Sequence, residues 1–323
     1  MKKYIFAVLF VALVTMVLPA AVVKMPSEKK ESEEKITQNT PDKIKVYIKN
    51  EDRVEEMDTK QYLKEVVSAE MPADFYEEAL KAQAVAARTY MVNRRNTYMD
   101  SGYPEVHKGA DICTDPAHCK AWISESARRE SWGNSADKNW AKISEAVEST
   151  DGVIITYEGK PISAVFHSTS SGHTENAIDV WGGNVPYLVS VASEGDSESP
   201  KYNSEAEYTT DEFKKICEKN ISGINWDNGL FSDISRSAAG GIISLKIGGV
   251  TVRGTEFRTM FALRSTNIDI TAEGSKITMK VRGYGHGVGM SQYGANYLAA
   301  QGKNYEEILK SYYTGVEVKN VYG

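Results

Sequence analysis

The sequence predicts an α+β fold in which helical and strand segments are grouped rather than alternated. Helical periodicity dominates residues 61–98, whereas two-residue alternation and glycine turns dominate residues 153–166 and 242–281. No internal repeat is evident, and the one-by-one alternation of strands and helices that builds a parallel sheet is missing. We therefore expect a helical lobe packed with a mixed, β-rich lobe around a cleft.

The chain begins with a segment suited to a membrane. Lys2 and Lys3 precede an apolar run over residues 4–23, about 20 residues and long enough to span a bilayer. Two lysines before the run favour a cytoplasmic N-terminus with the remainder exported. Ala20 and Ala21 could serve signal cleavage, but the length of the run favours an uncleaved anchor. Residues 1–23 are thus predicted to be a membrane anchor or signal segment, and the protein to be single-pass with its globular part outside the cytoplasm.

The rest of the chain divides into a tether and a globular region. Residues 24–43 are highly charged and offer few apolar side chains to bury, which predicts a flexible linker. Residues 44–323 are enough for a substantial core, and residues 190–265 are expected to form a subdomain. The net charge of −6 provides no basic patch, so a nucleic-acid partner is not expected.

The first half of the globular region is predicted to be mostly helical. Residues 45–49 alternate as a strand does, and a helix ending near Glu70 follows. A longer helix should run from about residue 75 to 98, with Asp74 as its N-cap. Small side chains on one stripe of this helix allow a neighbouring element to come close; the stripe holds Leu80, Ala84, Ala87 and Met91.

Strands dominate the second half. A helix over residues 140–149 precedes strands expected at 153–157 and 162–166, which are rich in β-branched side chains. Residues 193–237 are polar, with one short helix at 211–219 that carries Cys217 on its apolar side. Strands return at 242–247, 268–271 and 276–281 between glycine turns, and a last helix should span 305–312.

Glu70 is an acid on an apolar helix face. At about 100° per residue, Leu63, Val66 and Val67 share its stripe. The opposite side carries polar side chains, namely Gln61, Lys64, Glu65 and Ser68. Pro72 should end the helix and leave Glu70 at an edge open to a cleft. Burial raises a carboxyl pKa, as a general acid requires, although a salt-bridged structural glutamate would fit the same position.

A loop in the helical half holds two imidazoles and two thiols within thirteen residues. His107, Cys113, His118 and Cys119 could close a tetrahedral shell around zinc. Four protein ligands leave no open position, so such a zinc would be structural. A Cys113–Cys119 disulfide, permitted in an exported protein, is the alternative. Because a disulfide would not use the two histidines, the spacing favours zinc.

Residues 166–187 combine hydroxyls, imidazoles and aromatic rings just after a predicted strand. His167, Ser168, Ser171 and Thr174 are candidate ligands for a polyol, because hydroxyls and flat rings suit sugars. A Ser/Thr-rich loop that satisfies its own backbone is the alternative. The sequence lacks a Gly-x-Ser-x-Gly setting, so nucleophilic hydrolase chemistry at Ser168 is not favoured.

Residues 282–295 contain a glycine-rich segment that follows a strand. It matches neither the Walker loop nor the dinucleotide fingerprint, which argues against nucleotide binding. Its glycines allow a ligand or another backbone to approach closely, and His286 between two of them has little side-chain cover. We therefore place His286, Gln292 and Tyr293 on one wall of the expected cleft.

Five separated blocks in the same order resemble the stage II sporulation protein D family. They are Tyr62–Pro72, Glu78–Tyr90, Phe166–Gly183, Phe257–Thr266 and Gly283–Ala295. The resemblance extends from about residue 45 to the C-terminus. His173 departs from it, since many relatives have a second glycine after Gly172, and the His/Cys loop is not general to the family.

The resemblance implies a function and its partners. Family members are membrane-anchored lytic transglycosylases that cut peptidoglycan glycan strands during engulfment in sporulation, beside a cell-wall amidase and a polytopic membrane protein. By the resemblance, Glu70 is the catalytic acid and Arg88 a substrate-binding residue of the cleft. Relatives also include amidase enhancers, so a non-catalytic, peptidoglycan-binding activator is the alternative, and a zinc hydrolase a third reading.

Overall fold

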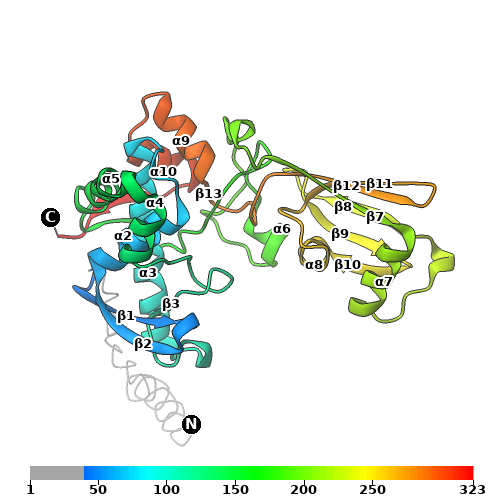
Figure 1. Ribbon diagram of the computed structural model, residues 1–323, viewed down its shortest axis with the longest axis horizontal. Helices are drawn as coiled ribbons and strands as arrows, with labels where there is room; N and C mark the ends of the chain where they lie inside the picture. The colour runs from blue at the N-terminus through cyan, green and yellow to red at the C-terminus, as the bar shows by residue number, and fades with distance from the viewer. Residues whose placement is uncertain (1–39, 323) are drawn as a thin grey trace, which may run out of the picture. The chain divides into compact units, whose positions relative to one another are not determined.

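The structure is a computed structural model that describes residues 40–322, and it confirms the α+β fold (Figure 1). The α-helices are α2 (Thr59–Glu70), α3 (Glu77–Ser101), α4 (Glu125–Trp132), α5 (Ala136–Glu148), α6 (Ala177–Trp181), α7 (Thr210–Asn220), α8 (Gly254–Met260), α9 (Gln292–Ala300) and α10 (Tyr305–Tyr312). The strands are β1 (Lys43–Ile48), β2 (Arg53–Asp58), β3 (Ile112–Cys113), β4 (Val153–Tyr157), β5 (Lys160–Pro161), β6 (Phe166–His167), β7 (Asn203–Thr209), β8 (Phe231–Arg236), β9 (Ile242–Ile247), β10 (Val250–Arg253), β11 (Asn267–Glu273), β12 (Lys276–Arg282), β13 (Met290–Ser291) and β14 (Glu317–Asn320).

A first hydrophobic core surrounds α3. Its stripe of small residues is buried as predicted, and α2, α5, α9 and α10 all pack against this helix. Two small sheets border the core, in the strand orders β2-β1-β3 and β14-β4-β5. The alanines of the stripe have short side chains, which lets neighbouring helices pack close to α3.

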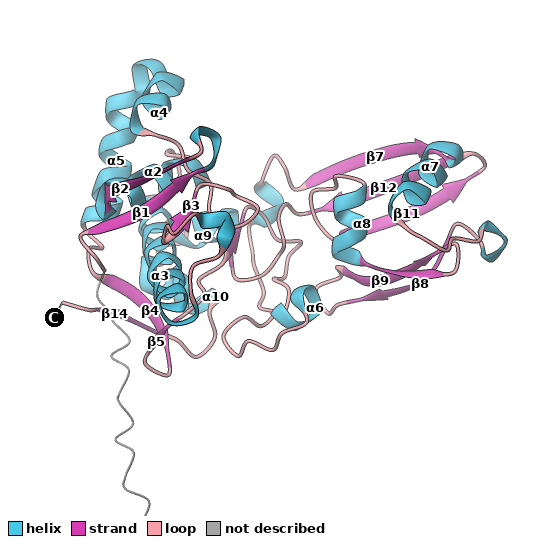
Figure 2. Cartoon of the chain, turned by 90° about the horizontal axis from the view of Figure 1, so that it is seen from below, coloured by secondary structure: helices cyan, strands magenta, loops and turns pink. Residues whose placement is uncertain are grey.

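A second hydrophobic core draws on residues 206–281 (Figure 2). Two antiparallel sheets, in the orders β10-β9-β8 and β11-β12-β7, enclose it together with α7 and α8. Cys217 is fully buried there, as expected of a small apolar side chain. The subdomain boundary at residues 190–265 stays a prediction.

The structure differs from the predicted elements where packing overrides a local signal. Residues 162–165 do not continue as a strand between β5 and β6. Asp74 does not cap α3: the helix begins after Tyr76, whose backbone N–H donates to Asn296 Oδ1 at 2.8 Å. The first turn of α3 has no side-chain cap, and the start of the helix is instead held by this contact with a residue 220 positions away along the chain.

Among residues 40–322, no helix is long and apolar enough to cross a membrane. The predicted anchor at residues 4–23 and most of the predicted linker at 24–43 lie outside the described residues. The single-pass arrangement and the exported position of the globular part accordingly stay predictions.

Candidate active site

A cavity of about 1080 Å³ lies where α2, α6, α8 and the glycine-rich segment meet. Its lining includes Glu70, His167, Ser168, His286 and Gln292. Five sequence-predicted site residues, from three separate stretches of the chain, are thus brought to one place.

Glu70 reaches the cavity because α2 ends there. Met71 is extended, with φ −128° and ψ 137°, as expected for the residue before Pro72. Glu70 is partly buried at the helix end, and its Oε1 accepts a hydrogen bond of 2.8 Å from the backbone N–H of Ala121. This bond fixes the carboxyl group against the cavity wall.

The surroundings of Glu70 act on its pKa in opposite directions. Burial raises the pKa, because removal from water penalises the carboxylate. The Lys120 ammonium, the Ala121 N–H and the Gln292 side chain favour the carboxylate and lower the pKa, but burial prevails. Glu70 is therefore a better proton donor near neutral pH than an exposed glutamate.

Glu65, expected on the solvent side of α2, is only 4% exposed. Its carboxylate accepts hydrogen bonds from Trp122 Nε1 at 2.8 Å and from the Glu125 backbone N–H at 3.0 Å. The expectation was wrong because helical periodicity carries no information about α4, which begins at Glu125 and covers this face.

Lys120 is a buried cation in the cavity wall that the sequence analysis did not single out. Its side chain is packed so that Nζ lies 3.6 Å from the Phe166 ring centroid and 4.3 Å from that of Tyr90. Such cation–π contacts offset part of the cost of desolvating an ammonium group. Burial still lowers the pKa of Lys120 to about 8. The nearby Glu70 opposes this shift, so the two charges support each other.

His167 and His286 lie side by side, with ring centroids 5.6 Å apart. The His167 Nδ1 atom is 3.2 Å from the Val288 carbonyl oxygen and so carries the proton. Its Nε2 is then an acceptor, and it is buried without a partner among the described residues. Gly285, at φ +121°, permits this arrangement, since a Cβ there would lie 2.6 Å from His167 Cβ.

Gln292 and two aromatic rings complete the wall. Gln292 is the first residue of α9, and its Nε2 donates to Gln83 Oε1 at 3.3 Å besides contacting Glu70. Trp181, which packs on His286 with ring centroids 5.2 Å apart, and Tyr284, 37% exposed, present accessible ring surface at the cavity. Flat aromatic faces and amide groups are suited to stack on and hydrogen-bond a sugar.

Arg88 does not line the cavity, so its expected place in the cleft is wrong. It is 0% exposed, and its guanidinium donates to the carbonyls of Thr150 at 2.7 Å, Val147 at 3.0 Å and Val153 at 3.2 Å. Val147 lies in the last turn of α5 and Thr150 just beyond it, where backbone acceptors lack partners within the helix, and Val153 begins β4. Arg88 therefore joins α3 to α5 and β4.

Three other predicted contacts also lie outside the cavity lining. The Thr174 hydroxyl accepts a hydrogen bond from the Val191 N–H at 2.9 Å, and that of Ser171 donates to the Ala239 carbonyl at 3.2 Å. The Tyr293 ring packs edge-on against Phe75, with centroids 5.0 Å apart. In this part of the loop the hydroxyls satisfy backbone groups, which was the alternative reading of its composition.

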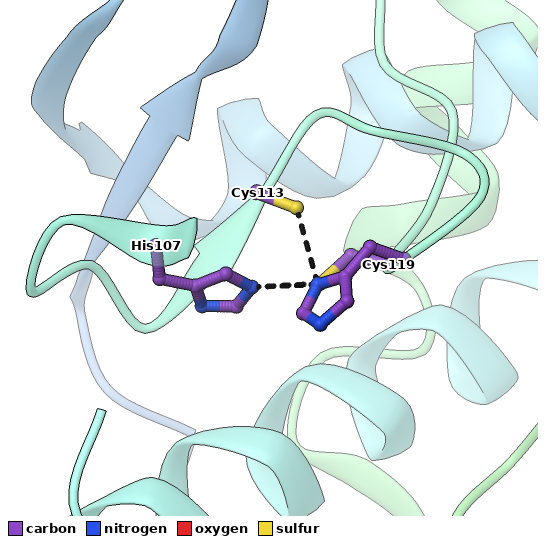
Figure 3. Close-up of side chains that lie close together, drawn as sticks. His107, Cys113 and Cys119 are labelled. Atoms are coloured by element: carbon purple, nitrogen blue, oxygen red, sulfur yellow. Dashed lines mark hydrogen bonds between the residues drawn. The ribbon is translucent and has the colours of Figure 1, made fainter. Parts of the chain in front are cut away.

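The predicted metal ligands converge (Figure 3). One ligand atom from each of His107, Cys113, His118 and Cys119 lies within 4.8 Å of the others. The His107 Nε2–His118 Nδ1 distance is 3.0 Å, and sulfur–nitrogen distances are 3.3–3.6 Å. Tetrahedral zinc bonds of about 2.0–2.3 Å separate ligand atoms by roughly 3.3–3.8 Å. The sulfur–nitrogen distances lie in this range and the two imidazole nitrogens are slightly closer, so a small shift of the histidines would let the four groups bind this ion.

The contacts around the four side chains agree with this fit. His107 Nδ1 lies 3.1 Å from the Ala110 carbonyl, which holds the proton there and leaves Nε2 free to bind a metal. The contact between the two thiols lowers the pKa of Cys113 and raises that of Cys119, so without a metal the two sulfurs share one proton, which a bound zinc ion would displace. Both cysteines are free thiols.

Sequence reasoning missed Lys120, Arg258 and Tyr284, all of which line the cavity. Lys120 follows a predicted metal ligand, and Arg258 and Tyr284 stand inside blocks that carry the family resemblance. Their local sequence offered no sign of burial or orientation, because residues far along the chain surround them.

Comparison with known proteins identifies the family. A family model described as a stage II sporulation protein matches residues 47–157. Stage II sporulation protein D of Bacillus amyloliquefaciens is 38% identical over 279 residues, covering 86% of this chain and 79% of that protein; the Bacillus subtilis protein of the same name is 38% identical over 280 residues with the same coverage. An amidase enhancer of Bacillus subtilis is 30% identical over 308 residues, covering 78% of this chain and 39% of that protein. The chain therefore belongs to the stage II sporulation protein D family.

Proposed function

We propose that this protein is a lytic transglycosylase that cleaves the bond between N-acetylmuramic acid and N-acetylglucosamine in peptidoglycan. Family membership supports a role in sporulation and at the cell wall. The observation that carries the proposal is the single carboxylate, Glu70, among the described residues that line the cavity. A hydrolytic glycosidase uses two carboxylates, whereas intramolecular attack by a sugar hydroxyl can proceed with one.

The proposed reaction uses Glu70 twice. Protonated Glu70 gives its proton to the glycosidic oxygen as the bond from the anomeric carbon of N-acetylmuramic acid to that oxygen breaks. The C6 hydroxyl of the same sugar attacks the anomeric carbon, and the Glu70 carboxylate takes the hydroxyl proton. The product is a 1,6-anhydro ring, no water is consumed, and Glu70 regains its starting form. Intramolecular attack has an effective-molarity advantage over water.

His167, Ser168, His286 and Gln292 are proposed to bind the substrate beside Glu70. The buried, unpartnered Nε2 of His167 can accept a hydrogen bond from a sugar hydroxyl or amide. By resemblance, we also propose that the protein is membrane-anchored and acts beside a cell-wall amidase and a polytopic membrane protein.

The similarity to an amidase enhancer favours a second candidate, a peptidoglycan-binding activator without turnover of its own. Purified protein should be incubated with glycan strands, alone and together with a cell-wall amidase. Release of soluble glycan fragments by the protein alone supports the enzyme. Faster amide hydrolysis without any glycan cleavage would support the activator instead.

The pH profile should report the Glu70 pKa. Because the acid form starts the reaction, we expect kcat/KM to be maintained below this pKa and to fall as pH rises through it. Lys120→Met removes a charge that lowers the Glu70 pKa, so the falling limb should move to higher pH. Lys201→Gln removes a cavity cation that does not act on Glu70 and should leave the limb in place. A limb that moves to lower pH in Lys120→Met would contradict the assignment.

We further propose that the His107, Cys113, His118 and Cys119 cluster holds a structural zinc ion. Bound zinc would cross-link residues 107–119 of the loop. The loop in turn places Lys120 and Ala121 beside Glu70, and the zinc would take no part in proton transfer. We expect one zinc per chain by elemental analysis, lost in Cys113→Ser and kept in Cys217→Ser. Loss of the metal should cost on the order of 3 kcal/mol or more of unfolding free energy.

Chelator and reductant separate the alternatives. If Cys113 and Cys119 form a disulfide, the protein contains no zinc, and reductant rather than chelator lowers its melting temperature. A zinc hydrolase would instead lose activity to chelator while its melting temperature stays unchanged.

A further inference from the structure

The cavity wall is basic although the chain is acidic. The net charge of the sequence is −6, yet the cavity is lined by Arg94, Lys120, Lys201 and Arg258 against one carboxylate, Glu70. The ion pairs formed within residues 40–322 involve other lysines and arginines. Cations that line a concave surface without protein counter-charges attract an anionic ligand.

Two cations lie near one ring of this wall, and a third lines the same cavity; we call Lys201, Arg258, Arg264 and Tyr284 the Tyr284 cluster. Lys201 Nζ lies 5.4 Å from the Tyr284 ring centroid and Arg264 Cζ 5.7 Å from it. Arg264 also donates to the Lys201 carbonyl oxygen at 3.3 Å, which holds the two segments together.

Arg258 is the cation of this cluster best placed to bind an anion in the cavity. It is partly buried, and its Nε donates to the Leu263 carbonyl at 3.2 Å, which orients the guanidinium. Burial lowers the pKa of Arg258 and Tyr284 opposes this shift, so the group is desolvated beside the ring. A guanidinium held in this way can bind a carboxylate through two parallel hydrogen bonds.

We propose that Arg258 and Lys201 form a carboxylate-binding subsite for the glycan strand, with the sugar ring that carries the carboxylate stacked on Tyr284. This inference rests on the proposed function, in which the substrate is a glycan strand, and adds that the strand must carry a negative charge. Two carboxylate sources exist in peptidoglycan: the lactyl group of N-acetylmuramic acid, and the stem peptide that can be attached to it.

The subsite lies apart from the acid. Glu70 ends α2, whereas Arg258 belongs to α8 and Lys201 precedes β7, so the acid and the subsite come from different elements of the cavity lining. Muramic acid alternates with glucosamine, so a carboxylate anchored here sets the register of the strand. It thereby determines which of the two alternating glycosidic bonds lies at Glu70, a discrimination that the acid cannot make alone.

The test measures binding rather than cleavage. Glu70→Gln protein is titrated calorimetrically with three ligands: peptide-free glycan strands, the same strands with their lactyl carboxyls converted to methylamides, and strands that retain stem peptides. We expect at least one of the two charged ligands, the peptide-free or the peptide-bearing strands, to bind at least roughly 10-fold more tightly than the neutral strands. This difference in affinity should shrink as salt is added. The tighter of the two charged ligands identifies the source of the carboxylate.

Variants in the same background assign the effect. Arg258→Gln and Lys201→Gln should weaken binding of charged strands and leave neutral strands unchanged, while Arg258→Lys should recover part of the loss. Lys280→Gln, at an exposed lysine of β12, removes the same charge elsewhere and should have no effect. Lys201 makes no side-chain hydrogen bond that would support the described fold, so its variant remains informative if Arg258→Gln is unstable.

The subsite is overturned if neutral strands bind as tightly as charged ones, or if the preference persists in both the Arg258 and Lys201 variants. If the protein binds charged strands more tightly than neutral ones but the wild-type protein cleaves no glycan, the carboxylate-binding subsite is supported and the transglycosylase activity is refuted.

Discussion

Glu70→Gln is expected to lower the glycan-cleaving turnover by about 10²- to 10⁴-fold, the usual contribution of a positioned general acid. The amide keeps the size of the side chain and can still accept the hydrogen bond from the Ala121 N–H. It cannot give a proton to the glycosidic oxygen or take one from the C6 hydroxyl. The measurement is the rate of glycan fragment release, with circular dichroism and the melting temperature to confirm the fold.

Glu65→Gln is the matched control. Glu65 is a buried glutamate of the same helix, but it holds Trp122 and Glu125 and does not line the cavity. We expect its variant to lose about 1 kcal/mol of stability and to retain turnover within about a factor of two. If Glu70→Gln cleaved glycan as fast as wild type, Glu70 would not be the catalytic acid.

Arg88→Met should cost about 3–5 kcal/mol of unfolding free energy, because it leaves buried carbonyl oxygens of Val147, Thr150 and Val153 without a charged donor. The same substitution removes the link between α3 and the end of α5. Urea unfolding followed by circular dichroism measures the loss, and turnover measured where the variant is folded should be close to wild type.

Two further substitutions bracket this effect. Arg88→Lys retains the charge but cannot span three acceptors, so its stability should fall between those of wild type and Arg88→Met. Arg95→Met, on the same helix but partly exposed and 3.8 Å from Asp111, should cost less than about 1 kcal/mol. An Arg88→Met variant that is as stable as wild type but inactive would contradict the structural role and support a role of Arg88 in substrate binding.

Elements with strong periodicity could be predicted from the sequence. Residues 305–312, 242–247 and 153–157 begin and end in the structure where the pattern places them, because each carries its own hydrophobic face. β14 and β2 could not be predicted, because the residues of β14 pair with residues 161–167 positions earlier in β4 and β2 has a polar, largely exposed sequence. Strand pairing of this kind depends on the partner rather than on local composition.

The site was predictable to the extent that its residues carried an unusual local setting. Glu70 on an apolar stripe and His286 between glycines both reached the cavity. Arg88 was placed in the cleft by the family resemblance, and the local sequence could not correct this, because a buried arginine in a helix gives the same pattern whether it contacts substrate or backbone carbonyls. Lys120 was missed because its burial depends on Tyr90 and Phe166, which lie 30 and 46 residues away in the sequence.

Mass spectrometry of glycan products formed in isotopically labelled water distinguishes intramolecular attack at the Glu70 site from hydrolysis. If Glu70 acts as acid and then as base within one turnover, every new muramic acid end carries a 1,6-anhydro ring, is lighter than a reducing end by one water, and contains no labelled oxygen. Reducing ends that contain labelled oxygen would show hydrolysis and contradict the proposed attack by the C6 hydroxyl.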